Sequence, residues 1–352
     1  GCRKPACPKQ MSRSLLSRRQ IIAAAFALLV PLSVPLEGHA DQEAKKAFGA
    51  VQAPSTGAPT PIGSYAKGCI SGAVQLPDDG PNWQSMRLAR NRHWGMPQTV
   101  ALLERLSQDA ASLGWGQGIL VGDMSQPRGG PMAFGHASHQ IGLDVDVWFT
   151  PMPDRRMTPE EREKLPFTSM LDKSKFLTVD PRKFTPTAAR LVMTAASYPQ
   201  VERIFVNPAI KKKLCETWSG DRNLLGKVRP MYGHDEHFHI RLECPPGVAS
   251  CKAQAAVASG DGCDKSLAWW FTDEPWAKPK PDPNKKPPPP PRPVMVSDLP
   301  QACSVVLAAP AARGAAVTAT SFAPAPVVDV APLADTPVLP QTAPAPVPRP
   351  RG

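Results

Sequence analysis

Histidine and aspartate side chains cluster in two short segments of this sequence. Five of the seven histidines lie in residues 135–149 (GHASHQIGLDVDVWF) and residues 233–242 (GHDEHFHIRL), namely His136, His139, His234, His237 and His239. The first segment also carries Asp144 and Asp146. Buried imidazoles and carboxylates need hydrogen-bond partners or a metal ion. The grouping therefore predicts a metal site rather than a set of unrelated structural histidines.

Both segments have the alternation that is typical of a half-buried β-strand. Asp144 and Asp146 alternate with valines, and His237 and His239 lie on either side of Phe238. Because successive strand residues point to opposite faces of a sheet, each pair presents its polar groups on one face. Two such strands can converge on one ion.

A turn is expected inside the first segment. His139 and Asp146 are seven residues apart, an odd step that would place them on opposite faces of a single strand. The chain must therefore turn between them. Gly142 is placed to allow this, because glycine tolerates backbone conformations that other residues avoid.

The side-chain types indicate which ion the site would hold. Two histidines and one carboxylate, without a thiolate, are typical of a catalytic zinc site that keeps its fourth position for water. Fe²⁺ uses the same ligand types. Zinc lowers the pKa of its bound water to about 7 and polarises a substrate carbonyl. A general base must stand beside the water without being a ligand, and His237 is placed for this role, two residues from His239 on the same face.

The elements that position these residues alternate between helical and extended patterns. Apolar spacing predicts an amphipathic helix over residues 97–113, with shorter helices over 158–164, 187–196 and 208–214. Residues 118–122 and 203–206 have the short apolar runs of buried strands. We predict an α+β fold: a small antiparallel β-sheet core flanked by helices and long loops, cross-linked by disulfides, with the zinc site on one face of the sheet.

Composition divides the 352 residues into a folded part and flexible ends. The 44 prolines exceed the usual share of about 5% and crowd toward the C-terminal end. We expect upstream residues and a signal peptide over 1–40, a flexible lead-in over 41–61, the zinc-binding domain over 62–275, a proline-rich spacer over 276–303 and a disordered Ala/Pro-rich tail over 304–352.

The N-terminal residues predict export. Met11 opens a basic stretch with Arg18 and Arg19, an apolar run follows over 21–36, and small residues precede Asp41, as signal peptidase requires. The paired arginines also fit a twin-arginine signal. Because the run is short and interrupted by prolines, we expect a cleaved signal peptide, with an uncleaved anchor as the alternative.

Cysteine usage agrees with an oxidising compartment. Six cysteines follow the expected cleavage point, and none of them forms a CxxC pair: Cys69, Cys215, Cys244, Cys251, Cys263 and Cys303. Neither a cysteine zinc knuckle nor a redox motif is therefore predicted, and three disulfides are expected. Fifteen pairings are open from the sequence alone, although the turn at 245–247 favours a local loop between Cys244 and Cys251.

The formal net charge of +11 favours an anionic partner, which could be nucleic acid, anionic lipid or an acidic cell-wall polymer. Composition alone does not choose between them. Part of the charge lies in the N-terminal and proline-rich ends, so the folded domain is less basic than the whole chain.

The metal-site residues carry a resemblance to a known group of enzymes. The stretch from Ser138 to Asp146, together with His237-Phe238-His239, resembles the HxxxxxxD and HxH pair of the lysostaphin, D-Ala-D-Ala carboxypeptidase and hedgehog-type metallopeptidases. Within this group, residues 135–146, 203–211 and 259–263 and the cysteine placement are similar to those of the penicillin-insensitive murein endopeptidases, from about Ile62 to Cys303.

This resemblance implies a periplasmic zinc metallopeptidase, a murein D,D-endopeptidase that hydrolyses the D-alanyl–meso-diaminopimelyl crosslinks of peptidoglycan. The expected partner is then peptidoglycan rather than nucleic acid. No stable membrane insertion is expected after removal of the signal, and a homo-oligomer is left open.

The resemblance also implies a role for each site residue. Zinc would be held by His139, Asp146 and His239, and His136 would bind the ion or line its site. His237 would be the base, with His234 beside it to stabilise the transition state. The implied disulfides pair Cys69 with Cys303, Cys215 with Cys263 and Cys244 with Cys251.

Three positions qualify these roles. Lys175 stands where the second-metal segment of the family has a histidine, so we expect one zinc ion per chain. Glu236 resembles the glutamate that is the base of the D,D-carboxypeptidase branch, but in a regular strand it points away from the ligand face, so we favour His237. Asp144 either orients a ligand from behind or binds the metal, and we favour the first role.

Two other functions are open. A D,D-carboxypeptidase of the same group would need a cation for the substrate carboxylate, which Arg128 or Arg229 could supply. A catalytically silent zinc module that binds the cell wall is the alternative from a different class.

Overall fold

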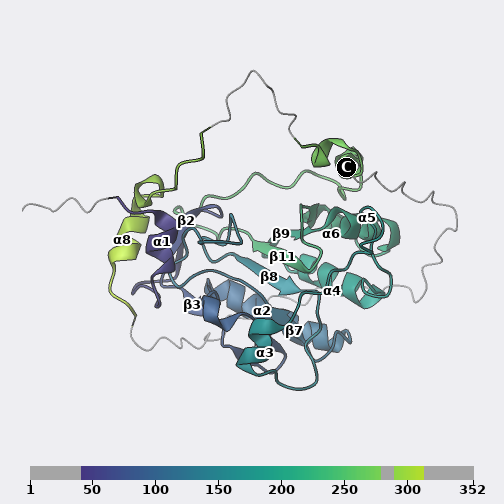
Figure 1. Cartoon of the computed structure of the whole chain (residues 1–352), viewed down its shortest axis with the longest axis horizontal. Coiled ribbons are helices and arrows are strands. Elements are labelled where there is room, and N and C mark those ends of the chain that lie inside the picture. Colours follow the sequence, from purple (N-terminus) through teal and green to yellow (C-terminus); the bar gives the residue numbers. More distant parts are fainter. Residues whose placement is uncertain (1–40, 279–288, 313–352) are drawn as a thin grey trace, which may run out of the picture. The chain divides into compact units, whose positions relative to one another are not determined.

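The computed structural model describes residues 41–278 and 289–312, and the expected signal peptide lies outside this range. The largest sheet has seven strands in the order β10-β9-β11-β8-β7-β5-β4. Its strands, in chain order, are β4 (Asp79–Gly80), β5 (Trp83–Ser85), β7 (Ile119–Val121), β8 (Asp144–Trp148), β9 (Val201–Val206), β10 (Val228–Pro230) and β11 (His237–Leu242). Figure 1 labels the central strands β9, β11, β8 and β7. Two smaller ladders pair β1 (Thr60–Ser64) with β2 (Lys67–Ser71) and β3 (Val74–Gln75) with β6 (Trp94–Gly95).

The helices match the predicted pattern in the middle of the chain. The expected helices are present as α2 (Pro97–Ser112), α3 (Pro159–Lys164), α4 (Pro186–Ser197) and α5 (Pro208–Thr217). The other helices described are α1 (Ala44–Gly49), α6 (Asn223–Lys227), α7 (Lys265–Trp269) and α8 (Ala302–Ala308), with short 3-10 turns η1 (Leu88–Arg90), η2 (Glu274–Trp276) and η3 (Val296–Asp298).

Local chemistry explains where three of these helices begin. Each of α3, α4 and α5 has a proline in its first turn and a polar N-cap side chain: Thr158, Thr185 and Asn207 accept hydrogen bonds from backbone N–H groups of the first turn. Such caps satisfy donors that have no partner inside the helix. These helix starts are therefore encoded within a few residues of sequence.

The predicted sheet was wrong in one respect, because the seven-stranded sheet is mixed rather than antiparallel. Its central strands β9, β11, β8 and β7 are antiparallel, but β5 pairs with β7 and β10 pairs with β9 in parallel. Parallel neighbours need a long crossover. Here α2 lies between β5 and β7 in the chain, and α5 and α6 lie between β9 and β10. These helices are the crossovers.

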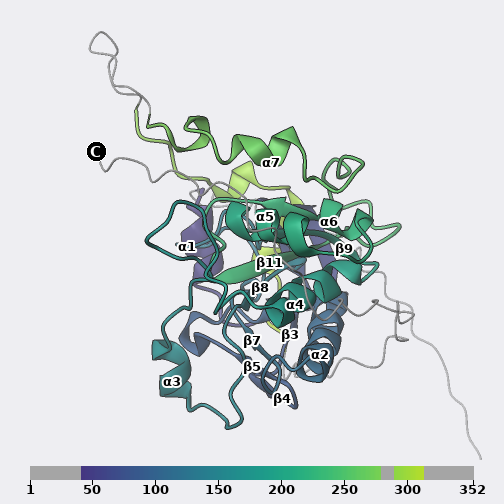
Figure 2. The same ribbon diagram turned by 90° about the vertical axis from the view of Figure 1, so that its right-hand side faces the viewer.

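One face of the sheet is buried under helices and the other carries the polar residues. Val145, Val147, Phe238 and Ile240 belong to the main apolar core, together with most of the buried residues of α2 and α4. Figure 2 shows α2 and α4 beside β7, β8 and β11. The alternating side chains of β8 and β11, which include Asp146 and His239, therefore lie on the opposite face.

The segments at both ends of the domain are more ordered than expected. Residues 41–61 are not a loose lead-in, because they contain α1 and the start of β1, and Ala44 and Phe48 are fully buried. Residues 304–308 are not part of a disordered tail, because they continue α8. Both segments pack in one apolar cluster with the Cys69–Cys303 disulfide. Residues 279–288 of the expected spacer and 313–352 of the expected tail lie outside the described range.

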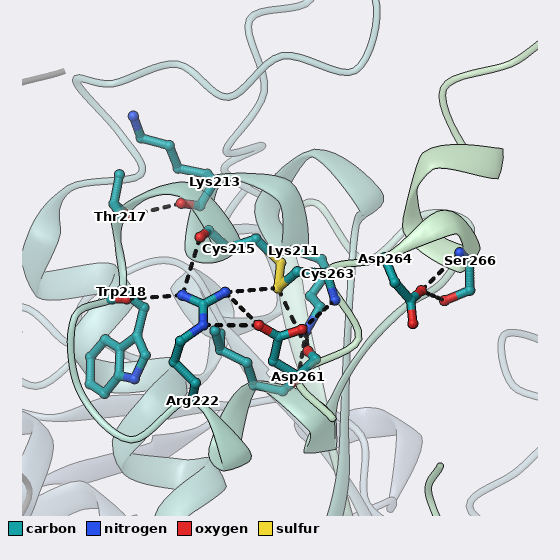
Figure 3. The surroundings of a disulfide bond; sticks show 11 residues. Lys211, Lys213, Cys215, Thr217, Trp218, Arg222, Asp261, Cys263, Asp264 and Ser266 are labelled. Carbon is teal, nitrogen blue, oxygen red and sulfur yellow. Dashed lines mark hydrogen bonds and ion pairs between the residues drawn. A yellow bond between two sulfur atoms is a disulfide. The ribbon is translucent and has the colours of Figure 1, made fainter. Parts of the chain in front are cut away.

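The structure contains the three disulfides that the resemblance implied: Cys69–Cys303, Cys215–Cys263 and Cys244–Cys251. Figure 3 shows the surroundings of the second, where Arg222 forms an ion pair with Asp261 at 2.6 Å and donates to the sulfur of Cys263. Nearby, Lys211 donates hydrogen bonds to the carbonyls of Leu225 (2.5 Å) and Asp261 (2.6 Å). Within the described residues, no helix has the length and hydropathy that a membrane crossing requires.

Candidate metal centre

Four of the five clustered histidines surround the carboxylate of Asp146. Its Oδ1 atom lies 3.4 Å from His139 Nε2, 3.5 Å from His239 Nδ1 and 3.7 Å from His237 Nε2. Its Oδ2 atom lies 3.5 Å from His136 Nε2. The two histidine-rich segments therefore meet at one point, as their spacing predicts.

Strand register brings the two segments together. Asp146 of β8 and His239 of β11 are direct partners in the antiparallel ladder. Directly opposite residues in such a ladder place their side chains on the same face, about 4.5–5.5 Å apart at Cβ. Their approach needs no loop and no induced movement.

A strained turn supplies His139. Gly142 has a φ of 74°, which confirms the predicted turn, and His139 itself has a φ of 65°. A non-glycine residue in this region costs on the order of 1–3 kcal/mol and persists only where its surroundings impose it. A hydrogen bond from the backbone N–H of His139 to Asp144 Oδ2 (3.0 Å) holds the turn.

Hydrogen bonds on the outer side of two rings orient them toward Asp146. His139 Nδ1 lies 2.9 Å from the carbonyl of Met124, and His239 Nε2 lies 2.8 Å from Asp144 Oδ1. The other nitrogen of each ring faces Asp146. Metal-binding histidines usually have this arrangement, with the far nitrogen engaged by a carbonyl or carboxylate.

Asp144 is fully buried behind the histidines. It accepts a hydrogen bond from Arg241 Nε at 2.7 Å in addition to those from His139 and His239. Burial alone would raise the pKa of Asp144, but the charge of Arg241 and the hydrogen bond from His239 outweigh it and hold this pKa well below its usual range. Asp144 is therefore an anion whose contacts are with the residues around the ion site.

Two inner atoms of the cluster are buried without a hydrogen-bond partner in the part of the chain that the structure describes. They are His139 Nε2 and Asp146 Oδ1. Buried polar atoms without partners are costly. His136, His139 and Asp146 each offer a ligand atom, and these atoms lie within 4.8 Å of one another. This donor set fits a divalent metal ion.

Asp146 and His239 have the ionisation that metal binding requires, whereas for His139 the charge of Asp146 outweighs burial and raises the pKa. Burial raises the pKa of Asp146, but the neighbouring His237 and His139 outweigh it and hold this pKa well below its usual range. Burial lowers the pKa of His239 to about 4, despite the nearby Asp144. A neutral imidazole and an ionised carboxylate are the forms that bind metal.

His237 and His234 lie at the open side of the cluster. The side chain of His237 is 24% exposed, whereas that of His139 is fully buried. The ring of His234 lies 5.0 Å from that of His237, and its Nδ1 lies 2.7 Å from the carbonyl of Tyr232. Burial, followed by the charge of His237, lowers the pKa of His234. Both residues are accessible to an entering substrate, as is His136, whose side chain is 19% exposed.

Asp123 also contacts the cluster, although the residue pattern of the sequence did not indicate it. Its Oδ2 atom lies 3.0 Å from His136 Nε2, 3.0 Å from Arg90 and 2.8 Å from Arg92. Asp123 follows β7, and its carbonyl accepts a hydrogen bond from the backbone N–H of Asp146. The position of Asp123 just after a predicted buried strand could have suggested a site residue. The sequence did not show, however, that this strand lies beside the strand that carries Asp146.

Three other candidates lie apart from the cluster. Arg128 is buried and donates to the carbonyls of Ala53, Val306 and Leu307, so it does not serve as a substrate cation. Arg229 is on β10, two strands from β11. Lys175 forms an ion pair with Asp172 at 3.4 Å.

Comparison with known proteins supports one family. The family model described as penicillin-insensitive murein endopeptidase matches residues 61–308. A relative with this name from Haemophilus influenzae is 43% identical over 274 residues, which cover 77% of this chain and 89% of the relative. Relatives with the same name from Pectobacterium atrosepticum and Klebsiella pneumoniae are each 42% identical, over 65% and 72% of this chain and 80% and 88% of their own lengths. The match spans every element of the ion site, and the chain belongs to the penicillin-insensitive murein endopeptidase family.

Proposed function

We propose that this chain is a zinc-dependent murein endopeptidase that hydrolyses the D-alanyl–meso-diaminopimelyl crosslinks of peptidoglycan in the periplasm. The observation that carries the proposal is the pair of buried, unpartnered atoms, His139 Nε2 and Asp146 Oδ1, in a chain of this family. The imidazole and carboxylate donors favour zinc, and the cluster lacks the thiolates that softer sites use.

The residues of the cluster would have separate roles in the reaction. His139, Asp146 and His239 would hold the ion, with His136 as a further ligand or as part of its wall. The ion, when bound, supplies Lewis-acid polarisation of the scissile carbonyl and activation of a water. His237, at the exposed side, would accept the proton of the attacking water and deliver it to the leaving amine. His234 would stabilise the developing negative charge beside it.

Asp144 would fix the orientation of the ligand histidines without contacting the substrate. It binds His239 Nε2 and the His139 backbone at once. A ring whose far nitrogen is held in this way presents its other nitrogen in a fixed direction. Rigid ligands of this kind reduce the reorganisation that binding and chemistry require.

Digestion of purified sacculi tests the function. We expect zinc-loaded protein to convert crosslinked muropeptide dimers to monomers, as measured by mass spectrometry, and chelated protein to leave the dimers intact. Metal analysis of the active protein should give one zinc ion per chain.

The same digests separate the alternatives. Release of terminal D-alanine from uncrosslinked pentapeptides, with the dimers intact, would establish a carboxypeptidase instead. Equal binding of loaded and chelated protein to sacculi, without any cleavage, would establish a non-catalytic wall-binding module.

A further inference from the structure

A cavity of 590 Å³ lies next to the ion site. His136 lines it together with Ala137 and Gln140. Its other walls come from the segment around α1, from the β1–β2 turn at Lys67, and from the chain that leads into η3. Ligand sites of proteins commonly have volumes of about 300–1,000 Å³, so a portion of a substrate fits here beside the candidate ion site.

The segments that close the cavity are held firmly. The backbone N–H of Ala44 donates to the carbonyl of Val294 at 2.8 Å, and that of Val296 donates to Gln42 at 2.9 Å. The Cys69–Cys303 disulfide links β2, which begins at Lys67, to α8. This wall is therefore part of the folded domain, although it comes from the two ends of the described chain.

The charges of the cavity are unbalanced. Both carboxylates among its lining residues already have cationic partners: Glu43 pairs with Lys45 at 3.0 Å, and Asp298 accepts two 2.7 Å hydrogen bonds from Arg292. Lys67 is exposed, and no hydrogen bond or ion pair engages its ammonium group within the described part of the chain, although its charge contributes, after the hydrogen bonds from Arg292 and Met295, to the lowered pKa of Asp298. The cavity therefore has a cation available for an anionic ligand.

We propose that this cavity binds a free carboxylate of the murein stem peptide, with Lys67 as the charged contact. The inference rests on the proposed function and adds a specificity-determining residue to it. A crosslinked stem peptide carries carboxylates near the scissile amide, and the cavity continues from His136 at the ion site. Lys67 would then form an ion pair with a carboxylate of the peptide, while the residues around Asp146 hydrolyse the crosslink.

Kinetics on a soluble crosslinked muropeptide dimer test the proposal. Because exposed ion pairs contribute roughly 0.2–1 kcal/mol, Lys67→Gln is expected to raise KM by about 1.4- to 5-fold and to leave kcat unchanged. Lys67→Arg should stay close to wild type. The matched control is Lys213→Gln on α5, which removes the same charge at a residue outside the cavity whose amine extends away from its neighbours (Figure 3).

Amidation of the substrate carboxylates, combined with Lys67→Gln, gives a double-mutant-type cycle that measures the interaction between the lysine and the carboxylate. The amidated dimer should raise the wild-type KM by the same factor and should not raise that of Lys67→Gln further. An equal effect of amidation on both proteins, or equal effects of Lys67→Gln and Lys213→Gln, would overturn the proposal.

A binding measurement separates this proposal from the proposed function. If wild-type protein binds the dimer but cannot cleave it, the proposed function fails. Calorimetry with chelated protein then still decides the role of the cavity, because Lys67→Gln must weaken binding of the dimer and Lys213→Gln must not.

Discussion

Asp146 and His239 face each other across two strands, and every other histidine of the cluster is positioned relative to that pair. The register places them together, the turn at Gly142 adds His139, and Asp144 orients two rings from behind. The half-buried position of His237 follows from its place at the start of β11. At the scale of single residues, burial distinguishes the groups that would hold an ion from the group that would move a proton.

His237→Gln is expected to lower kcat by about 10²–10⁴-fold, the usual contribution of a general base, with the zinc content unchanged. Glu236→Gln is the matched comparison, because Glu236 precedes β11 and no hydrogen bond or ion pair joins its carboxylate to the cluster in the described residues. Steady-state kinetics and metal analysis of both variants are the measurements. A large loss in Glu236→Gln with a small loss in His237→Gln would make the glutamate the base.

Lys211 makes the stability of the domain depend on pH. Its side chain is fully buried, and burial followed by the charge of Arg229 lowers its pKa to about 7. The unfolded chain has the ordinary, higher lysine pKa and binds more protons above pH 7, so the free energy of unfolding should rise with pH from about 7 to about 10.

Urea unfolding at several pH values between 7 and 10 measures this slope. Lys211→Met should flatten it, because the substituted side chain does not titrate. Lys213→Met, which removes a lysine whose amine projects away from the disulfide (Figure 3), should leave the slope unchanged. Identical slopes in all three proteins would show that the amine of Lys211 titrates normally.

At the scale of elements, the turn before β8 and the crossovers around the sheet decide the geometry. The glycine at position 142 has a positive φ, and a Cβ atom there would lie 2.8 Å from Ile70 Cδ1 and 3.0 Å from the backbone nitrogen of Met96. The turn is therefore both conformationally restricted and tightly packed. Its distortion would move His139 relative to Asp146.

Gly142→Ala is expected to lower both the stability of the domain and its zinc content. The left-handed backbone alone costs roughly 1–2 kcal/mol for an alanine, and crowding against Ile70 and Met96 adds to it. Gly114→Ala is the control, since Gly114 has a φ of 79° and a Cβ there would meet nothing within 4 Å. Urea unfolding and metal analysis compare the two. Equal stability losses with full zinc in both would mean that packing around the turn does not position His139.

At the scale of the whole molecule, the two ends of the described chain close one side of the domain. Segments 41–49 and 289–308 meet in the apolar cluster that contains Phe48, Leu299 and Val306 (Figure 1). The Cys69–Cys303 disulfide spans 234 residues of sequence, whereas Cys244–Cys251 spans seven. The long link holds distant segments, and the short one holds a local loop.

Removal of the long disulfide is expected to destabilise the domain by about 2–5 kcal/mol. Replacement of Cys69 and Cys303 by serine should also raise KM for the muropeptide dimer, because the cavity next to His136 loses its fixed wall. The double substitution of Cys244 and Cys251 is the control and should leave KM unchanged. Unfolding midpoints and kinetics measure the two effects, and an unchanged KM in the first variant would show that the wall stays in place without the link.

Much of the local structure could be predicted from the sequence. Helices α2 to α5, the alternation of β8 and β11 and the turn at Gly142 depend on residues close together in the chain, through side-chain spacing, N-caps and glycine conformation. The histidine and aspartate clusters could be identified in the same way. Residue patterns left the disulfide pairing open, and the resemblance to the family supplied it.

Other features depended on residues that are far apart. The parallel pairs at the sides of the sheet, the contact of Asp123 with His136 and the packing of α1 against α8 join segments whose own sequences contain little evidence of their partners. A short helix such as α1 or α8 is marginal alone and forms because packing stabilises it. The sequence by itself therefore determined the ligand types and the strands that carry them. Only the tertiary structure decided which residues surround Asp146, because strand register and long-range packing arise from contacts that local patterns do not contain.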